Sequence, residues 1–230
     1  MSEATATALE SHEHPAHLQH HFVSSEQQFD AAKMGMWLFL ITEILLFSGM
    51  FVAYTVYRVW HPEVFAQSAD LLDWRLGGLN TVVLLLSSFT VAYGITRIQR
   101  GDQKGLMINL VITLVCAAAF MVVKYFEYTG KFAVGIFPGA GFAPVGVYHG
   151  HELSHYDIPY APQFFSIYFV MTGIHGVHVL VGMGIFTWLL VKAKRGRFTS
   201  EYYTPVELSG LYWHLVDIIW IFLFPLLYLI

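Results

Sequence analysis

A carboxylate lies near the middle of the first long apolar stretch of this chain, which runs from Lys33 to Tyr54. The stretch is long enough to cross a bilayer, because a spanning helix needs roughly 20 apolar residues. Glu43 therefore sits about half-way through the hydrocarbon, where an ionised carboxylate is costly. Its side chain must face protein, water or a partner, or stay protonated, and we expect a neutral carboxyl.

Small residues mark one side of the same stretch, because Gly35, Thr42 and Gly49 recur every seven residues. Such residues let helices approach closely, so this side is predicted to be a packing face. Glu43 is one position round from it and is therefore expected to point into a helix bundle. Two interpretations are open: a hydrogen-bonded carboxyl that only fixes packing, or a functional intramembrane acid.

The rest of the chain repeats the membrane pattern, since 56% of its residues are hydrophobic and only 12% are charged. We predict an all-α membrane bundle of five transmembrane helices. It forms one membrane domain (31–230), preceded by a polar, His-rich tail (1–30). That tail has no basic segment before an apolar core, so it is not expected to be a signal peptide. The predicted spans are 31–57, 78–98, 106–126, 162–191 and 205–230.

Basic residues predict the orientation. Lys33, the loop after the second span and the loop after the fourth span lie on one side, which is richer in lysine and arginine and is therefore cytoplasmic. The N-terminus is then cytoplasmic and the C-terminus periplasmic. The richest loop is expected to bind anionic lipid headgroups through four side chains: Lys192, Lys194, Arg195 and Arg197.

The charged residues that end the third span, Lys124 and Glu127, lie on the opposite side by this topology. Both are close enough to the predicted interface for their side chains to snorkel toward water. They are therefore interpreted as an interfacial anchor.

Cysteine and charge limit the chemistry that the chain itself can carry. Cys116 is the one cysteine, so there is no disulfide, no Cys-x-x-Cys-His haem attachment and no two-cysteine copper centre. A formal net charge of −4 is too small to indicate a nucleic-acid partner. Any redox chemistry is expected to belong to another subunit.

Histidines gather in two regions outside the predicted spans. The tail holds five in an irregular pattern, which we interpret as a solvated segment: His12, His14, His17, His20 and His21. The loop 129–161 is rich in glycine and proline and carries five candidate metal ligands: His149, His151, Glu152, His155 and Asp157. A loop of this length is usually functional or disordered. We favour a contact surface for a neighbouring subunit or a soluble electron donor over a metal site.

Two further histidines lie inside the fourth span. His175 and His178 share one helical face with Gly182, at i, i+3 and i+7. Histidines at this spacing could ligate a metal or hydrogen-bond across a helix interface. A haem between helices would need a ligand opposite, and only His214 is available.

The fifth span places His214 and Asp217 on one face with Glu207 and Gly210. Lipid exposure is strongly disfavoured for such groups. We therefore predict one buried polar cluster, made of Glu43, His175, His178, His214 and Asp217.

Three segments together resemble subunit III of haem–copper terminal oxidases: Trp37–Gly49, Thr172–Val179 and Tyr212–Trp220. Leu79–Ser88 and Phe126–Tyr128 also match the pattern of that family. The resemblance covers residues 33–230. It implies a helical bundle in the inner (cytoplasmic) membrane, bound directly to the catalytic subunit I and present with subunit II and a small subunit IV.

The resemblance also implies a role. A subunit of this kind carries no redox centre, because haem and copper belong to its partner subunits. It holds phospholipid, stabilises the catalytic subunit and supports proton uptake while oxygen is reduced to water. Glu43 matches the buried, carbodiimide-reactive carboxylate of the family, and a Glu at this position favours cytochrome c as the electron donor over a quinol.

The chain departs from the seven-helix pattern of the family because it begins at what would be the third helix. Lipid contacts made by the two missing helices cannot be transferred to it, and the loop 129–161 is longer than usual. Three alternatives remain open: a quinol oxidase subunit, a nitric oxide reductase accessory subunit, and a small proton or metal transporter. The last would be expected to show internal repeats with interrupted helices.

Overall fold

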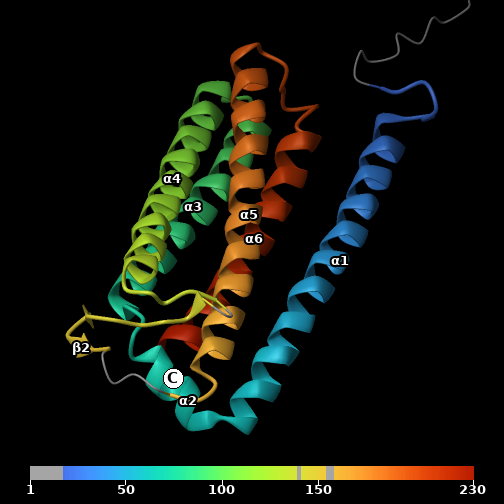
Figure 1. Cartoon of the computed structure of the whole chain (residues 1–230). Helices are drawn as coiled ribbons and strands as arrows, with labels where there is room; N and C mark the ends of the chain where they lie inside the picture. Colours follow the sequence, from blue (N-terminus) through green and yellow to red (C-terminus); the bar gives the residue numbers. More distant parts are fainter. Residues whose placement is uncertain (1–17, 139–140, 154–157) are drawn as a thin grey trace, which may run out of the picture.

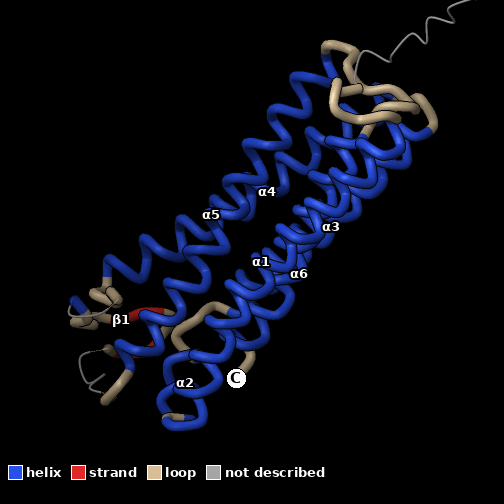
Figure 2. Tube along the Cα trace, turned by 90° about the vertical axis from the view of Figure 1, so that its right-hand side faces the viewer, coloured by secondary structure: helices blue, strands red, loops and turns tan. Residues whose placement is uncertain are grey.

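The computed structural model describes residues 18–138, 141–153 and 158–230. Five long helices run along one common direction, with loops gathered at the two ends (Figures 1 and 2). They are α1 (Ser25–Trp60), α3 (Trp74–Gln99), α4 (Gln103–Ala133), α5 (Ala161–Lys194) and α6 (Thr204–Tyr228). All five are long and apolar enough to cross a membrane, which confirms the predicted all-α membrane bundle. Its orientation in the membrane stays a prediction.

The helices begin and end where the sequence provides the local chemistry. Ser24 caps α1 by accepting from the backbone N–H of Gln27, while Asp73 and Asp102 cap α3 and α4 in the same way. Helix α1 stops at Trp60, and Pro62 opens a short helix that the sequence did not predict, α2 (Pro62–Ala69).

Four of the five predicted spans lie inside helices: 31–57 in α1, 78–98 in α3, 106–126 in α4 and 162–191 in α5. The fifth, 205–230, extends two residues beyond the end of α6. Helix α4 continues to Ala133, so the loop after it is shorter than the predicted 129–161. That loop contains an antiparallel hairpin whose strands are two residues long each, β1 (Val147–Tyr148) and β2 (His151–Glu152).

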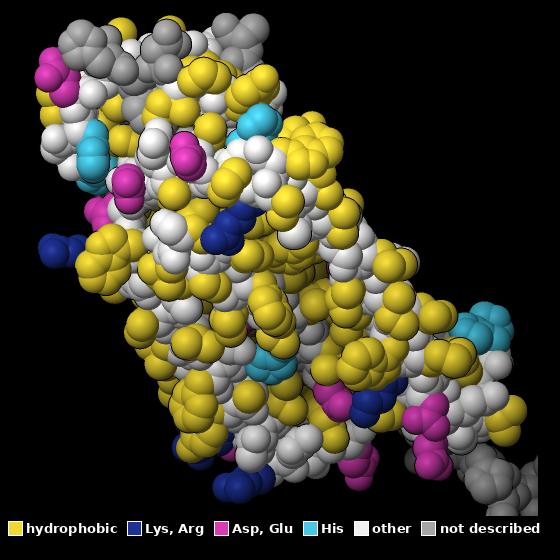
Figure 3. All heavy atoms as spheres, turned by 90° about the horizontal axis from the view of Figure 1, so that it is seen from below, with side chains coloured by type: hydrophobic (Ala, Val, Ile, Leu, Met, Phe, Trp, Pro, Cys, Tyr) yellow, Lys and Arg dark blue, Asp and Glu magenta, His cyan; other side chains and the backbone are white. Residues whose placement is uncertain are grey.

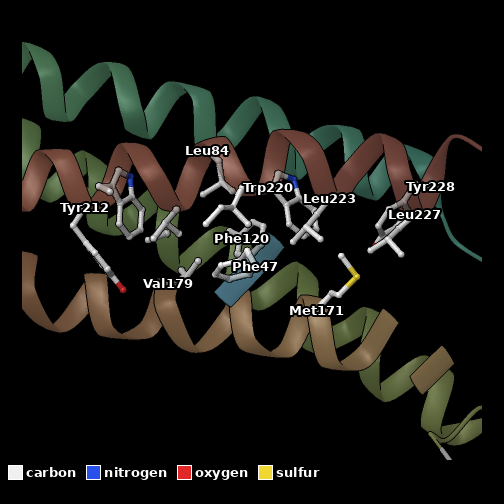
Figure 4. Packing of buried hydrophobic residues seen from close by; sticks show 14 of the residues in the cluster. Phe47, Leu84, Phe120, Met171, Val179, Tyr212, Trp220, Leu223, Leu227 and Tyr228 are labelled. Carbon is white, nitrogen blue, oxygen red and sulfur yellow. The ribbon is translucent and has the colours of Figure 1, made fainter. Parts of the chain in front are cut away.

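Helices α3 to α6 form the compact part of the bundle, and α1 stands beside them (Figure 1). In the middle of the bundle the rings of Phe120 and Trp220 meet edge to face, with centroids 4.9 Å apart (Figure 4). Closer to the N-terminal end of α6, Trp213 packs against Gly182, where an added Cβ would lie 2.5 Å from the indole ring. The glycine is therefore what allows α5 and α6 to approach.

Helix α1 is the least buried of the five. Only 11% of its most apolar window is buried, against 50% for α6. An added Cβ at Gly35 or Gly49 would meet nothing within 4 Å. The predicted small-residue packing face therefore packs against none of the described residues, because α1 turns its larger side chains toward α6 instead.

Candidate functional site

Glu43 and His178 join α1 to α5 near the middle of both helices. Glu43 Oε2 lies 2.8 Å from His178 Nε2, and the two side chains are 16% and 17% exposed. Phe47 packs edge to face on the imidazole, and the hydroxyl of Tyr212 donates to the backbone carbonyl of His178 over 2.9 Å. The pair is thus partly screened from the membrane and fixed from three helices.

The second imidazole nitrogen determines what the pair can do. His178 Nδ1 lies 2.8 Å from the carbonyl oxygen of Ile174, an acceptor only, so Nδ1 carries a hydrogen. The contact with Glu43 therefore holds one proton, either on a neutral carboxyl that donates to the imidazole or on an imidazolium that donates to a carboxylate. The geometry thus fixes one shared hydrogen between a side chain of α1 and a side chain of α5.

The other three members of the predicted cluster have different surroundings. His214 Nδ1 lies 2.6 Å from Ser88 Oγ, which joins α6 to α3. His175 is fully buried between the rings of Phe120 and Trp220. Its nitrogens have no hydrogen-bond partner within the described residues, whereas Asp217 interacts with Ser88, the serine that also contacts His214.

The five residues therefore do not form one hydrogen-bonded network. Glu43 pairs with His178, and His214 pairs with a serine that the sequence interpretation did not include. A shared helical face predicts which residues turn inward, but it does not predict which neighbouring helix each of them meets.

The charged residues near the end of α4 form a buried polar cluster, and their interpretation as an interfacial anchor was wrong. Lys124 and Glu127, expected to snorkel as an anchor, are buried together with Lys131 near the end of α4. Each lysine Nζ lies 2.9 Å from one oxygen of Glu127, whose side chain is only 1% exposed. The hydroxyls of Tyr168 and Tyr228 donate to the same carboxylate over 2.8 and 2.6 Å. We call these five residues the lysine–glutamate cluster.

An acidic residue and the hairpin also lie in the region around this cluster. Asp73, the N-cap of α3, interacts electrostatically with Lys131 and with Tyr148 of β1. Burial, together with the charges of Glu127 and Asp73, raises the pKa of Tyr148 to about 12. The cluster joins α4, α5 and α6 at one end of the bundle, where the ammonium of Lys131 also lies 5.9 Å from the centre of the Tyr148 ring in the hairpin.

No group of three or more histidine, cysteine or acidic side chains that could hold a metal occurs in residues 18–138, 141–153 and 158–230. In the hairpin loop, His149, His151 and Glu152 are exposed. The remaining loop candidates, His155 and Asp157, lie outside the described residues, as do His12, His14 and His17 of the tail.

The four basic residues predicted to bind lipid lie where α5 ends and the next loop begins. Lys194, Arg195 and Arg197 are exposed, and Lys192 places its ammonium 4.0 Å from the centre of the Trp188 ring. At this end of the bundle Lys33 and Glu207 join α1 to α6, with 3.2 Å between Nζ and Oε1. An aromatic ring beside a basic cluster is the arrangement typical of a membrane interface.

The sequence matches the family model described as cytochrome c oxidase subunit III, over residues 15–155 and 148–230. It is 30% identical to cytochrome c oxidase subunit 3 of Thermostichus vulcanus, in an alignment that covers 100% of this chain and 96% of that protein. It is 31% identical to quinol oxidase subunit 3 of Bacillus subtilis, over 85% of each chain. It is 32% identical to cytochrome c oxidase subunit 3 of Synechocystis, over 87% of this chain and 76% of that protein.

Proposed function

The chain belongs to the cytochrome c oxidase subunit III family, and from this we propose that it is the non-catalytic subunit III of a proton-pumping cytochrome c oxidase. It is a subunit of a terminal oxidase complex and a multi-pass membrane protein. In our proposal it contacts subunit I directly, in a complex with subunit II and a small subunit IV. Haem and copper are held by those partners in the cytoplasmic membrane.

Two relatives support cytochrome c as the electron donor. The alignment that covers this whole chain is with a protein named cytochrome c oxidase subunit 3, and the Synechocystis relative has the same name. Glu43 favours the same donor. A quinol oxidase is the second candidate, because relatives with that name are equally similar, at 30–31% identity.

The observation that carries the proposed role is the contact between Glu43 and His178. A shared proton at bilayer depth suits a subunit that supports proton uptake by its catalytic partner. The same contact holds the loosely packed α1 against the bundle, so it also serves stability. We expect the exposed faces of α1 to be covered by lipid and by neighbouring subunits.

The test is to isolate the chain from membranes in mild detergent, record a visible spectrum and measure oxygen uptake. We expect haem-containing subunits to co-purify and reduced cytochrome c to support oxygen consumption. Oxygen uptake with a quinol but not with cytochrome c would favour the second candidate. Isolation at full yield without any haem protein would contradict both and would favour a transporter.

A further inference from the structure

Four helices meet in one buried layer around Trp220. The centre of the indole ring lies 4.9 Å from that of Phe120 on α4 and 5.2 Å from that of His175 on α5. Its Nε1 donates to the hydroxyl of Thr81 on α3 over 3.1 Å. Figure 4 shows Trp220 and Phe120 together among the buried side chains in the middle of the bundle. The layer thus contains side chains from α3, α4, α5 and α6.

Two polar side chains at this level are buried without a partner. His175 has no exposed surface, and neither of its nitrogens has a hydrogen-bond partner within the described residues. Asn80, the residue before Thr81, is 1% exposed, and the oxygen and nitrogen of its amide are likewise unpaired among those residues. A neutral imidazole offers one donor and one acceptor, and an amide offers two donors and an acceptor. Because unpaired buried polar groups are costly, native proteins pair nearly all of them.

The two groups come from opposite sides of the bundle. Helices α3 and α5 each pack mainly on α4 and α6, so they face each other across the bundle axis. The imidazole of His175 is flanked by the rings of Phe120 and Trp220, which leave its nitrogens unpaired. The surface seen from the end where α1 stops is largely hydrophobic, with charged side chains scattered over it (Figure 3). A partner for these atoms therefore has to lie inside the bundle.

The layer borders the lysine–glutamate cluster. Lys124 Nζ lies 4.8 Å from the centre of the Trp220 ring, and its charge also acts on His175. Its hydrogen bonds to Glu127 and Tyr228 point to the end of the bundle. Polar groups thus continue from the cluster into the middle of the bundle.

Water is the ligand that suits this layer. It donates and accepts at once, and a buried water typically makes about three hydrogen bonds to polar groups that are otherwise unsatisfied. A metal cation is disfavoured beside the ammonium of Lys124. An apolar molecule would leave the imidazole of His175 and the amide of Asn80 unpaired.

We propose that the bundle binds internal water beside Trp220, hydrogen-bonded to His175 and Asn80. This water hydrates the inner border of the lysine–glutamate cluster. The proposal does not rest on the oxidase function, because the unpaired atoms belong to this chain alone.

Trp213 provides an internal control two turns away on the same helix. It is as fully buried as Trp220, and its Nε1 donates to Ser87 over 2.9 Å. Its ring packs closely on Gly182. The level of Trp213 is therefore expected to be dry.

The experiment is hydroxyl-radical footprinting of the full-length chain, purified in mild detergent with the subunits that accompany it. A short X-ray pulse splits water, the radical attacks the nearest side chain, and mass spectrometry locates the added oxygen. A buried tryptophan is oxidised quickly only where water is bound beside it. The ratio of oxidation at Trp220 to that at Trp213 is the readout.

The variants remove or keep the polar atoms of the layer. The double variant His175→Phe, Asn80→Leu removes them, whereas His175→Gln keeps a donor and an acceptor. The matched control is Asn109→Leu, which removes a buried amide that already donates to the carbonyl of Gly105 over 2.8 Å. Cys116, which is buried, should stay closed to maleimide in every variant that is folded.

We expect Trp220 to be oxidised faster than Trp213 in the unchanged chain, in His175→Gln and in Asn109→Leu. The double variant should lose this difference, so that both tryptophans react at the same slow rate.

Two results would overturn the proposal. One is a Trp220 that is oxidised no faster than Trp213 in the unchanged chain, which would mean that the layer is dry. This comparison needs no variant, so it decides the matter even where the double variant fails to fold. The other is fast oxidation of Trp220 that persists in the folded double variant, because the water would then be held by other groups.

Discussion

Replacing Glu127 by glutamine should destabilise the bundle more than any other single exchange of a carboxylate for its amide. The carboxylate accepts from two lysines and two tyrosines, and it neutralises Lys131, whose side chain has no exposed surface. A glutamine keeps the size but leaves buried ammonium groups without a counter-charge. Breaking a buried ion pair in this way costs about 3–5 kcal/mol.

The expected cost of Glu127→Gln can be compared with the cost of removing one of the tyrosine hydroxyls that donate to Glu127. Tyr228→Phe removes the hydrogen bond that the hydroxyl donates to Glu127 and the one that it accepts from Lys124, so its cost should be at least about 1.5–3 kcal/mol. Glu63→Gln, on the exposed first turn of α2, is the matched control and should change nothing measurable. Replacing Lys124, Glu127 and Lys131 together by apolar residues of similar size should be far less harmful than Glu127→Gln, because no unpaired charge remains.

Cys116 provides the assay. It is the one cysteine of the chain and is buried, so a maleimide dye that fluoresces on reaction reports unfolding in detergent. The melting temperature should be highest for the Glu63→Gln control, lower for Tyr228→Phe and lowest for Glu127→Gln. A Glu127→Gln variant that melts with the control would refute the reasoning, because it would mean that the lysines are solvated or neutral.

Three further predictions concern other parts of the bundle. Glu43→Gln should keep the contact with His178 and should still co-purify with the haem-containing subunits. Glu43→Leu should lower the free energy of unfolding by about 1–3 kcal/mol, because it leaves the imidazole without a hydrogen-bond partner. Equal melting temperatures for the two variants would contradict this prediction. Gly182→Ala should cost about 1–3 kcal/mol by overpacking against Trp213, while Gly184→Ala, where a Cβ meets nothing within 4 Å, should be neutral in the same assay. The four basic residues at the end of α5 are Lys192, Lys194, Arg195 and Arg197. Exchanging all four for glutamine should lower the amount of co-purified anionic phospholipid, because each contributes about 1 kcal/mol of attraction to an anionic membrane surface. An unchanged lipid content on mass spectrometry would count against this prediction.

The sequence by itself determined the number of spans and the family. Hydropathy depends on local composition, and a stretch of about 20 apolar residues has few alternatives to a membrane helix. The three motifs that resemble subunit III are also local, so they could be recognised without coordinates. Glu43 and His178 were expected to point into the bundle for the same reason, because a charged or polar side chain in the middle of a span is disfavoured in contact with lipid.

Only the tertiary structure decided which of these side chains meet. The sequence spacing places Lys124 and Glu127 near a helix end, where long charged side chains commonly reach water. They are buried instead because Tyr168 and Tyr228 approach from two other helices and supply hydrogen bonds. Partners that lie 41 and 101 residues away in the chain leave no local signal, since a helix pattern gives the direction of a side chain and not the neighbour that it faces.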